Sequence, residues 1–199
     1  YEEDELIDLD ITSVIVAPSS KNFKSIKKKV EEDFKNLKNQ NVDLIIVLPH
    51  MGTQFSHEFD VFQNTWNKIF IDNGASIILS DHSHAVQPIV YSNESIVVNS
   101  PGNFANQYVD YDGDATSIVE IYVDKSNKKI VASSVIPMYT QGYSNGFYRA
   151  LPIYDIYTND ELFTEINYPC NCVVMGTLDV PSCINSSIIC FNEGKLILY

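Results

Sequence analysis

The chain has 199 residues, of which 45% are hydrophobic and 12% aromatic, so it is long enough and apolar enough to bury a real core. Its formal net charge is −13, from 13 basic and 26 acidic side chains, which argues against nucleic acids and anionic membranes as partners because basic surfaces bind both. No apolar run reaches the roughly 18 residues that a membrane-spanning helix needs, so we expect no transmembrane segment in this chain.

Strands and helices alternate in the first eighty residues. Ile11 to Val16 is predicted to be a strand, and the apolar spacing from Phe23 to Leu37 predicts an amphipathic helix. Val42 to Leu48 is continuously aliphatic apart from Asp43, which is typical of a strand covered on both faces. A second helix is expected from about Phe59 to Asp72, and a further strand from Ile77 to Leu79. This order predicts an α/β fold with a largely parallel, right-handed layer.

Short strands separated by turn residues follow, which indicates hairpins in place of crossovers. We expect one domain over residues 1–152 and an extension over residues 153–199. The predicted strands are Ile89 to Tyr91, Ile96 to Val98, Ser117 to Tyr122, Lys129 to Ile136, and a closing hairpin of Ile184 to Cys190 and Lys195 to Tyr199.

All four histidines lie between positions 50 and 84, close to the predicted strand ends. His50 follows the first aliphatic run, His82 and His84 follow the second, and His57 lies between the two. A neutral imidazole offers a lone pair to a metal or a proton, and α/β proteins place their sites at such strand ends. The alternative is that each histidine is a packed or surface residue. Their clustering favours a metal site.

The motifs that contain these histidines resemble those of a known family. Residues 50–59 read H-M-G-T-Q-F-S-H-E-F, Gln63 follows, residues 82–88 read H-S-H-A-V-Q-P, and residues 99–104 read N-S-P-G-N-F. In order and spacing, over about residues 12–152, they are similar to the C-terminal half of the capsule-synthesis CapA (PgsA-like) family. This family is a branch of the calcineurin-like metallophosphoesterases.

The resemblance implies a mixed-sheet α/β/β/α sandwich, present here as its C-terminal half, with a site for one or two divalent ions (Mn, Zn or Fe). By role, the resemblance implies His50, His82 and His84 as metal ligands, His50, His57 and His82 as catalytic groups, and Asn103, Gln87 and Ser100 as substrate contacts. Gln87 and Ser100 are also expected to support the metal ligands.

The chain departs from the family pattern at several positions. Gln54 replaces a Glu, Met51 replaces a Trp, and Ser80 and Ser83 replace Gly and Pro. The family's opening G-D and Asn-containing motifs, which supply the bridging carboxylate, have no counterpart in this chain. We therefore expect a missing N-terminal half or partner chain.

Two functional hypotheses follow from the resemblance. One is a metal-dependent hydrolase acting on an anionic envelope polymer such as poly-γ-glutamate, and the retained histidines and Asn103 favour it. The other is a binding or assembly subunit that has lost catalysis, and Gln54 favours that reading because it removes a carboxylate.

The four cysteines lie in the last thirty residues, at positions 170, 172, 183 and 190. Their spacing lacks the usual C-x-x-C of a zinc site, which favours one or two disulfides, or free thiols. We expect a bridge from Cys170 or Cys172 to Cys183 or Cys190. Such a bridge would indicate an extracellular or cell-envelope location.

Overall fold

A computed structural model of the chain describes residues 21–92, 94–105, 114–142 and 148–153, and the backbone of residues 189–192 and 195–198. The strand expected at residues 11–16 and the expected disulfide lie outside this set. In chain order the elements are α1 (Phe23–Asn39), β1 (Ile46–Val47), α2 (Val61–Asp72), β2 (Ile77–Leu79), β3 (Ile89–Tyr91), β4 (Ile96–Val98), β5 (Ala115–Val123), β6 (Ile130–Gly142), β7 (Tyr148–Pro152), β8 (Ile189–Asn192) and β9 (Lys195–Leu198).

A mixed four-stranded sheet has the order β1-β2-β4-β3. β1, β2 and β4 are parallel, and β3 is antiparallel to β4. β5, β6 and β7 form a separate antiparallel sheet, and β8 pairs with β9 in the expected closing hairpin. The α/β class and the change from crossovers to hairpins after residue 88 are confirmed.

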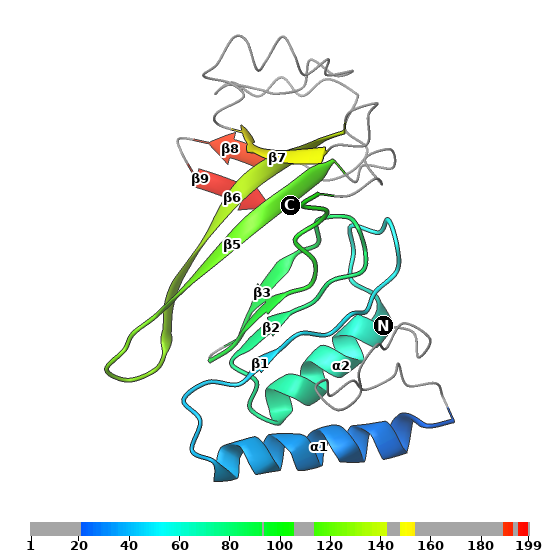
Figure 1. Ribbon diagram of the computed structural model, residues 1–199, viewed down its shortest axis with the longest axis vertical. Helices are drawn as coiled ribbons and strands as arrows, with labels where there is room; N and C mark the ends of the chain where they lie inside the picture. Colours follow the sequence, from blue (N-terminus) through cyan, green and yellow to red (C-terminus); the bar gives the residue numbers. More distant parts are fainter. Residues whose placement is uncertain are drawn as a thin grey trace.

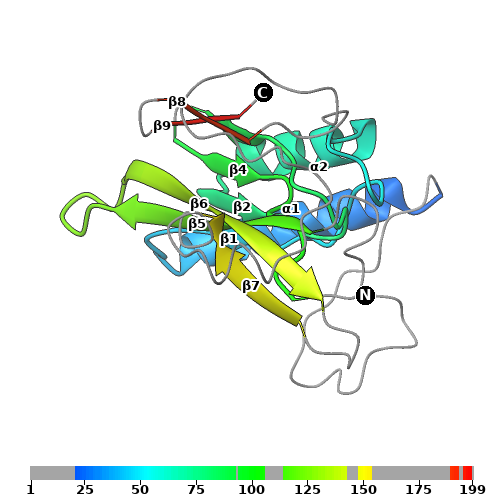
Figure 2. The same cartoon turned by 90° about the horizontal axis from the view of Figure 1, so that it is seen from above.

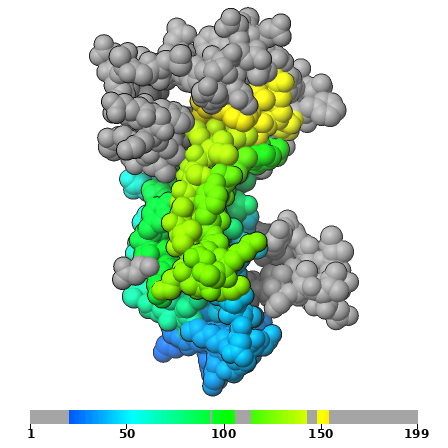
Figure 3. Space-filling model, turned by 90° about the vertical axis from the view of Figure 1, so that its left-hand side faces the viewer, coloured from blue at the N-terminus to red at the C-terminus, as the bar shows by residue number. Residues whose placement is uncertain are grey.

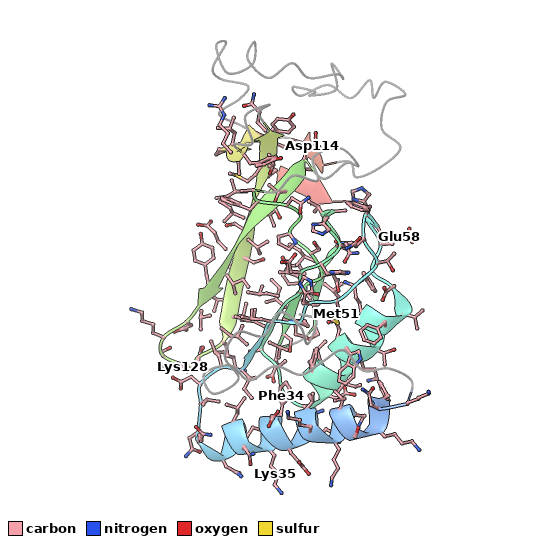
Figure 4. All side chains as sticks on the ribbon, turned by 45° about the vertical axis from the view of Figure 1, so that its right-hand side comes forward. Phe34, Lys35, Met51, Glu58, Asp114 and Lys128 are labelled. Atoms are coloured by element: carbon pink, nitrogen blue, oxygen red, sulfur yellow. The ribbon has the colours of Figure 1, made fainter. Side chains whose placement is uncertain are left out.

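Both helices cover the same face of the mixed sheet (Figure 1). Phe34 of α1 stacks on Phe70 of α2, and Phe23 meets Trp66 edge to face. Phe34 points from α1 toward this core while Lys35 points away from it, as the helical spacing predicts (Figure 4). Neither described helix is long and apolar enough to cross a membrane.

The opposite face of the mixed sheet lies under β5 and β6 (Figure 2). Ile77, Ile96 and Val98 are buried but do not belong to the helix-side cluster, and strand alternation directs them toward β5 and β6. The β5–β6 hairpin forms a continuous column over this face (Figure 3). The described residues therefore form three layers, one of helices and two of strands.

The strand predicted over residues 42–48 differs most from the structure. Only Ile46 and Val47 pair, and β1 lies at the edge of the sheet, not inside it. Ile46 is 54% exposed and the adjoining Leu48 is 73% exposed. The prediction that this strand is covered on both faces is wrong for the described residues. Val47 packs against the helix-side core, whereas Ile46, whose side chain is on the other face, is mostly exposed.

Candidate functional site

His50 and His82 meet where the parallel strands β1 and β2 end. A parallel bridge pairs His50 with Asp81, the Met51 N–H donates to the Asp81 carbonyl (2.8 Å), and the Asp81 N–H donates to the Pro49 carbonyl (3.1 Å). These bonds continue the β1–β2 pairing one step beyond the strands. His82 Nδ1 lies 3.0 Å from His50 Nε2, and the two ring centroids are 4.6 Å apart.

The backbone of His82 has φ +126°, a conformation that side-chain-bearing residues rarely adopt. Its N–H donates to the side-chain Oδ1 of Asp81 (2.7 Å), which helps to hold this conformation. Strained backbone of this kind costs on the order of 1–3 kcal/mol and concentrates at functional sites. This backbone conformation occurs at the residue whose ring meets His50.

The pKa of His82 lies below its ordinary value. Burial is the main cause, and the neighbouring His50 and His84 add to it, since a second positive charge beside either ring is unfavourable. A lowered pKa favours the neutral form of the imidazole. A neutral ring has the lone pair that a metal or a proton requires.

His84 lies further from the pair, with its ring centroid 6.3 Å from that of His82. Its Nδ1 is 2.7 Å from Asn103 Oδ1, so Nδ1–H donates and the lone pair lies on Nε2. Phe55 stacks on the ring with centroids 5.7 Å apart. Thr140 of β6 donates to the Asn103 carbonyl (2.5 Å), which fixes this asparagine from the second sheet.

The other expected site residues, Gln87, Ser100 and His57, bond to the backbone of the loops around the histidine pair. Gln87 and Ser100 are each 1% exposed. Gln87 donates to two backbone carbonyls, and the Ser100 hydroxyl accepts from the Gly102 N–H (3.2 Å). His57 Nδ1 lies 3.1 Å from the Val86 carbonyl. In this geometry Gln87 and Ser100 support the loops, and their predicted contact with substrate stays a prediction.

The pair can be compared with what a metal ion requires. Two imidazole nitrogens bound about 2.0–2.1 Å from one ion, at tetrahedral or right angles, are about 2.9–3.4 Å apart. The His50–His82 separation of 3.0 Å fits two ligands of one ion. Within the described residues, however, no group of three or more His, Cys, Asp or Glu side chains is arranged to hold a metal. The described residues alone therefore do not form a metal site, and the predicted metal ligands stay a prediction.

Residues 9–108 match the family described as "Bacterial capsule synthesis protein PGA_cap", and this segment includes the histidine motifs, Gln87 and Asn103. The chain belongs to this capsule synthesis family. It is similar to "Capsule biosynthesis protein CapA" of Bacillus anthracis, with 33% identity over 70 residues. It is also similar to "PGA biosynthesis protein CapA" of Bacillus subtilis (strain 168), with 29% identity over 65 residues.

These matches cover part of each protein. They span 35% and 33% of this chain, and 17% of each CapA relative. The capsule synthesis family match ends at residue 108, so β5 to β9 lie beyond it. The family resemblance read from the motifs is confirmed over the segment that contains every expected site residue.

Sequence analysis did not predict the buried polar residues beneath the histidines of this capsule synthesis protein. The side chains of Gln63, Asn67 and Asn99 are buried and bond to one another or to nearby backbone. One sequence signal could have identified Gln63. Asp60 and Gln63 have the spacing of a helix capping box, and both of its reciprocal bonds are present at the start of α2.

Proposed function

We propose that this chain is the C-terminal half of a metal-dependent hydrolase-type domain that acts on a capsule or envelope polymer such as poly-γ-glutamate. The complete domain would be an α/β/β/α sandwich of the metallophosphoesterase type, located outside the cell or in its envelope. Membership of the capsule synthesis family and the printed role of the relatives in capsule or PGA biosynthesis support this proposal.

The single observation on which the proposal rests is the His50–His82 pair. The two nitrogens lie 3.0 Å apart at the loop end of a parallel sheet, and the pKa of His82 is lowered. His50 Nε2 and His82 Nδ1 would hold an ion of Mn, Zn or Fe, for which imidazole is a suitable ligand. When bound, such an ion polarises an acyl or phosphoryl group and lowers the pKa of water.

The chain's own residues would orient this chemistry. Asn103 accepts from His84 Nδ1 and so presents Nε2 of that ring as the lone-pair nitrogen. His57, which Val86 holds through Nδ1, lies on the same loop as Phe55. We assign His57 to proton transfer or to polymer binding at the entrance, and His84 to completing the ligand set.

The proposal requires further ligands from an N-terminal half, supplied by a longer polypeptide or by a partner chain. Among the described strands none lies beyond β1 in the sheet, and this supports the requirement. Ile46 and Leu48 are largely exposed there, and unpaired strand edges with apolar side chains associate readily. A strand added at β1 would cover this edge and place its own loop end beside His50.

The test is to produce this chain together with an N-terminal half, either fused to it or co-expressed as a partner chain, and to measure metal content and cleavage of poly-γ-glutamate. His50→Asn and His82→Asn should each lower bound metal and abolish cleavage. Gln40→Glu, a change on an exposed residue at the end of α1, is the matched control and should alter neither. An assembled protein that binds metal and polymer but never cleaves would contradict the hydrolase proposal.

The second candidate is a binding or assembly subunit that keeps the fold without catalysis. Gln54, where the family pattern has Glu, is the observation that favours it, since an exposed amide cannot replace a carboxylate as a base or metal ligand. Polymer binding that persists in His82→Asn, with no turnover in any form, would support this alternative.

A further inference from the structure

Two fully buried glutamines are in contact behind the histidine loops. Gln63, on the first turn of α2, is 0% exposed, and Gln87, on the loop that follows β2, is 1% exposed. The Gln63 amide Nε2 donates to Gln87 Oε1 (2.8 Å) and to the Asn99 carbonyl (3.4 Å). This contact links α2 to the loops that follow β2 and β4.

Gln87 continues the link to the loop that follows β1. Its Nε2 donates to the carbonyls of Ser56 (2.9 Å) and Glu58 (3.1 Å). These carbonyls belong to the same loop as His50, and Gln87 itself lies three residues after His84. We call Gln63 and Gln87 the amide relay. Through it, the two loops whose histidines form the pair share one set of buried hydrogen bonds.

The loop backbone also rests directly on the relay at Gly52. Gly52 has φ +127°, and a Cβ at this position would lie 2.9 Å from the Cδ and Nε2 of Gln63. Only glycine allows the loop to come this close to the buried amide. The segment two residues after His50 is therefore packed against Gln63.

The chemistry of position 63 separates two explanations for the glutamine. The capping box uses Oε1, which accepts from the Asp60 N–H (3.0 Å), and a glutamate would do this equally well. The amide N–H groups do something else, because they point to Gln87 Oε1 and the Asn99 carbonyl, which are both acceptors. A carboxylate at position 63 would place oxygen against oxygen in a buried site. Starting the helix does not require the amide, whereas the relay does.

We propose that Gln63 and Gln87 are positioning residues that hold the loop of His50 and the loop of His82 at the separation needed for the pair. The proposal deepens the proposed function, because it concerns the same pair of rings. The residues act on the loops, because their amides donate to loop backbone carbonyls.

The test uses the full chain with Gln63→Glu, which keeps the capping acceptor and removes the donors. Gln87→Glu keeps the acceptor for Gln63 and removes the donors to Ser56 and Glu58. Gln40→Glu makes the same chemical change on an exposed residue and is the control. Gln63→Met and Gln87→Met remove the donors without adding charge.

The first readout is the ring ¹⁵N spectrum of His50 and His82, recorded without metal at a temperature where each variant is folded by circular dichroism. This spectrum reports the tautomers and the contact between the rings. The second readout is the affinity for Zn²⁺ alone, measured by calorimetry. We expect the relay variants to lose the ring–ring contact and to bind Zn²⁺ about 10- to 100-fold more weakly, the usual cost of removing a group that orients metal ligands. Gln40→Glu should match the wild type in both.

Folded relay variants with wild-type ring spectra would overturn the proposal. Relay variants that all fail to fold would also overturn it, because the glutamines would then serve the fold alone. If the wild-type chain binds no Zn²⁺, the ring spectra still decide whether the relay positions the pair. That result would count against the metal-dependent function and leave the positioning role to be judged by the spectra.

Discussion

In β4, Ile96, Val97 and Val98 are each 2% exposed or less, whereas in β1 Ile46 is 54% exposed and the adjoining Leu48 is 73% exposed. Both strands are short, aliphatic and parallel to β2, one on each side of it. β4 has a further partner in β3, the helices on one face and β5 and β6 on the other, while β1 has β2 as its only described neighbour in the sheet. An aliphatic sequence therefore does not distinguish a central strand from a strand at the edge of the described sheet.

The largest expected effect comes from truncating equivalent side chains in the two strands. Ile96→Ala should lower the free energy of unfolding by about 2–5 kcal/mol, because it leaves a cavity in a fully packed site. Ile46→Ala should cost about 0.5 kcal/mol or less, as expected of an exposed residue. Urea denaturation of both variants of this chain measures the difference. Equal costs would mean that something covers the edge of β1 in solution.

A smaller effect is expected where the loop after β1 packs on the amide relay. Gly52→Ala should lower the free energy of unfolding by about 1–3 kcal/mol, because the backbone has φ +127° and the added Cβ meets the Gln63 amide. Gly74→Ala, with φ +94°, is the control, because its Cβ would meet the end of the flexible Lys38 side chain. Both variants should be less stable than the wild type.

Only Gly52→Ala should also change the ring ¹⁵N signals of His50 and His82. This would show that β1, the outermost strand of the described sheet, is fixed at its loop end. If Gly74→Ala disturbed the rings as strongly, the effect would come from general loss of stability.

The sequence predicted the elements better than their surroundings. Helical spacing located α1 and α2 to within two residues at each end, because the periodicity reports the buried face directly. Burial was harder to predict. Phe62, an aromatic residue of α2, is 38% exposed, while the polar side chains of Gln63 and Asn67 are buried in that helix. Hydrophobicity alone cannot reveal a buried polar side chain whose partners come from distant loops.

The candidate site was predictable to a similar degree. The position of His50 and His82 at the ends of successive strands was enough to expect that they would meet, because parallel strands end at the same edge of a sheet. The roles of Gln87 and Ser100 could not be read in this way. Whether a polar residue faces a substrate or a backbone carbonyl depends on its rotamer and on loop packing, and sequence spacing does not encode either.

The smallest expected effect is a pH dependence of stability at the junction of β1 and β2. Because the pKa of His82 is lowered in the folded chain, the folded state binds fewer protons at this ring than the unfolded state does. The contribution of His82 to the free energy of unfolding should therefore be constant above about pH 6.5, the ordinary value for histidine, and should fall as the pH decreases below it.

His82→Asn should remove this dependence, and it should also relieve the repulsion that a charged His50 would meet. Denaturation curves between pH 5 and pH 8, in the presence of a chelator, measure the pH dependence of the free energy of unfolding. His57→Asn is the comparison, because His57 lies outside the pair. A slope that is unchanged in His82→Asn would show that another group controls it. A slope that disappears would show that His82 carries the pH dependence, as expected of a ring that is partly buried where β1 and β2 end.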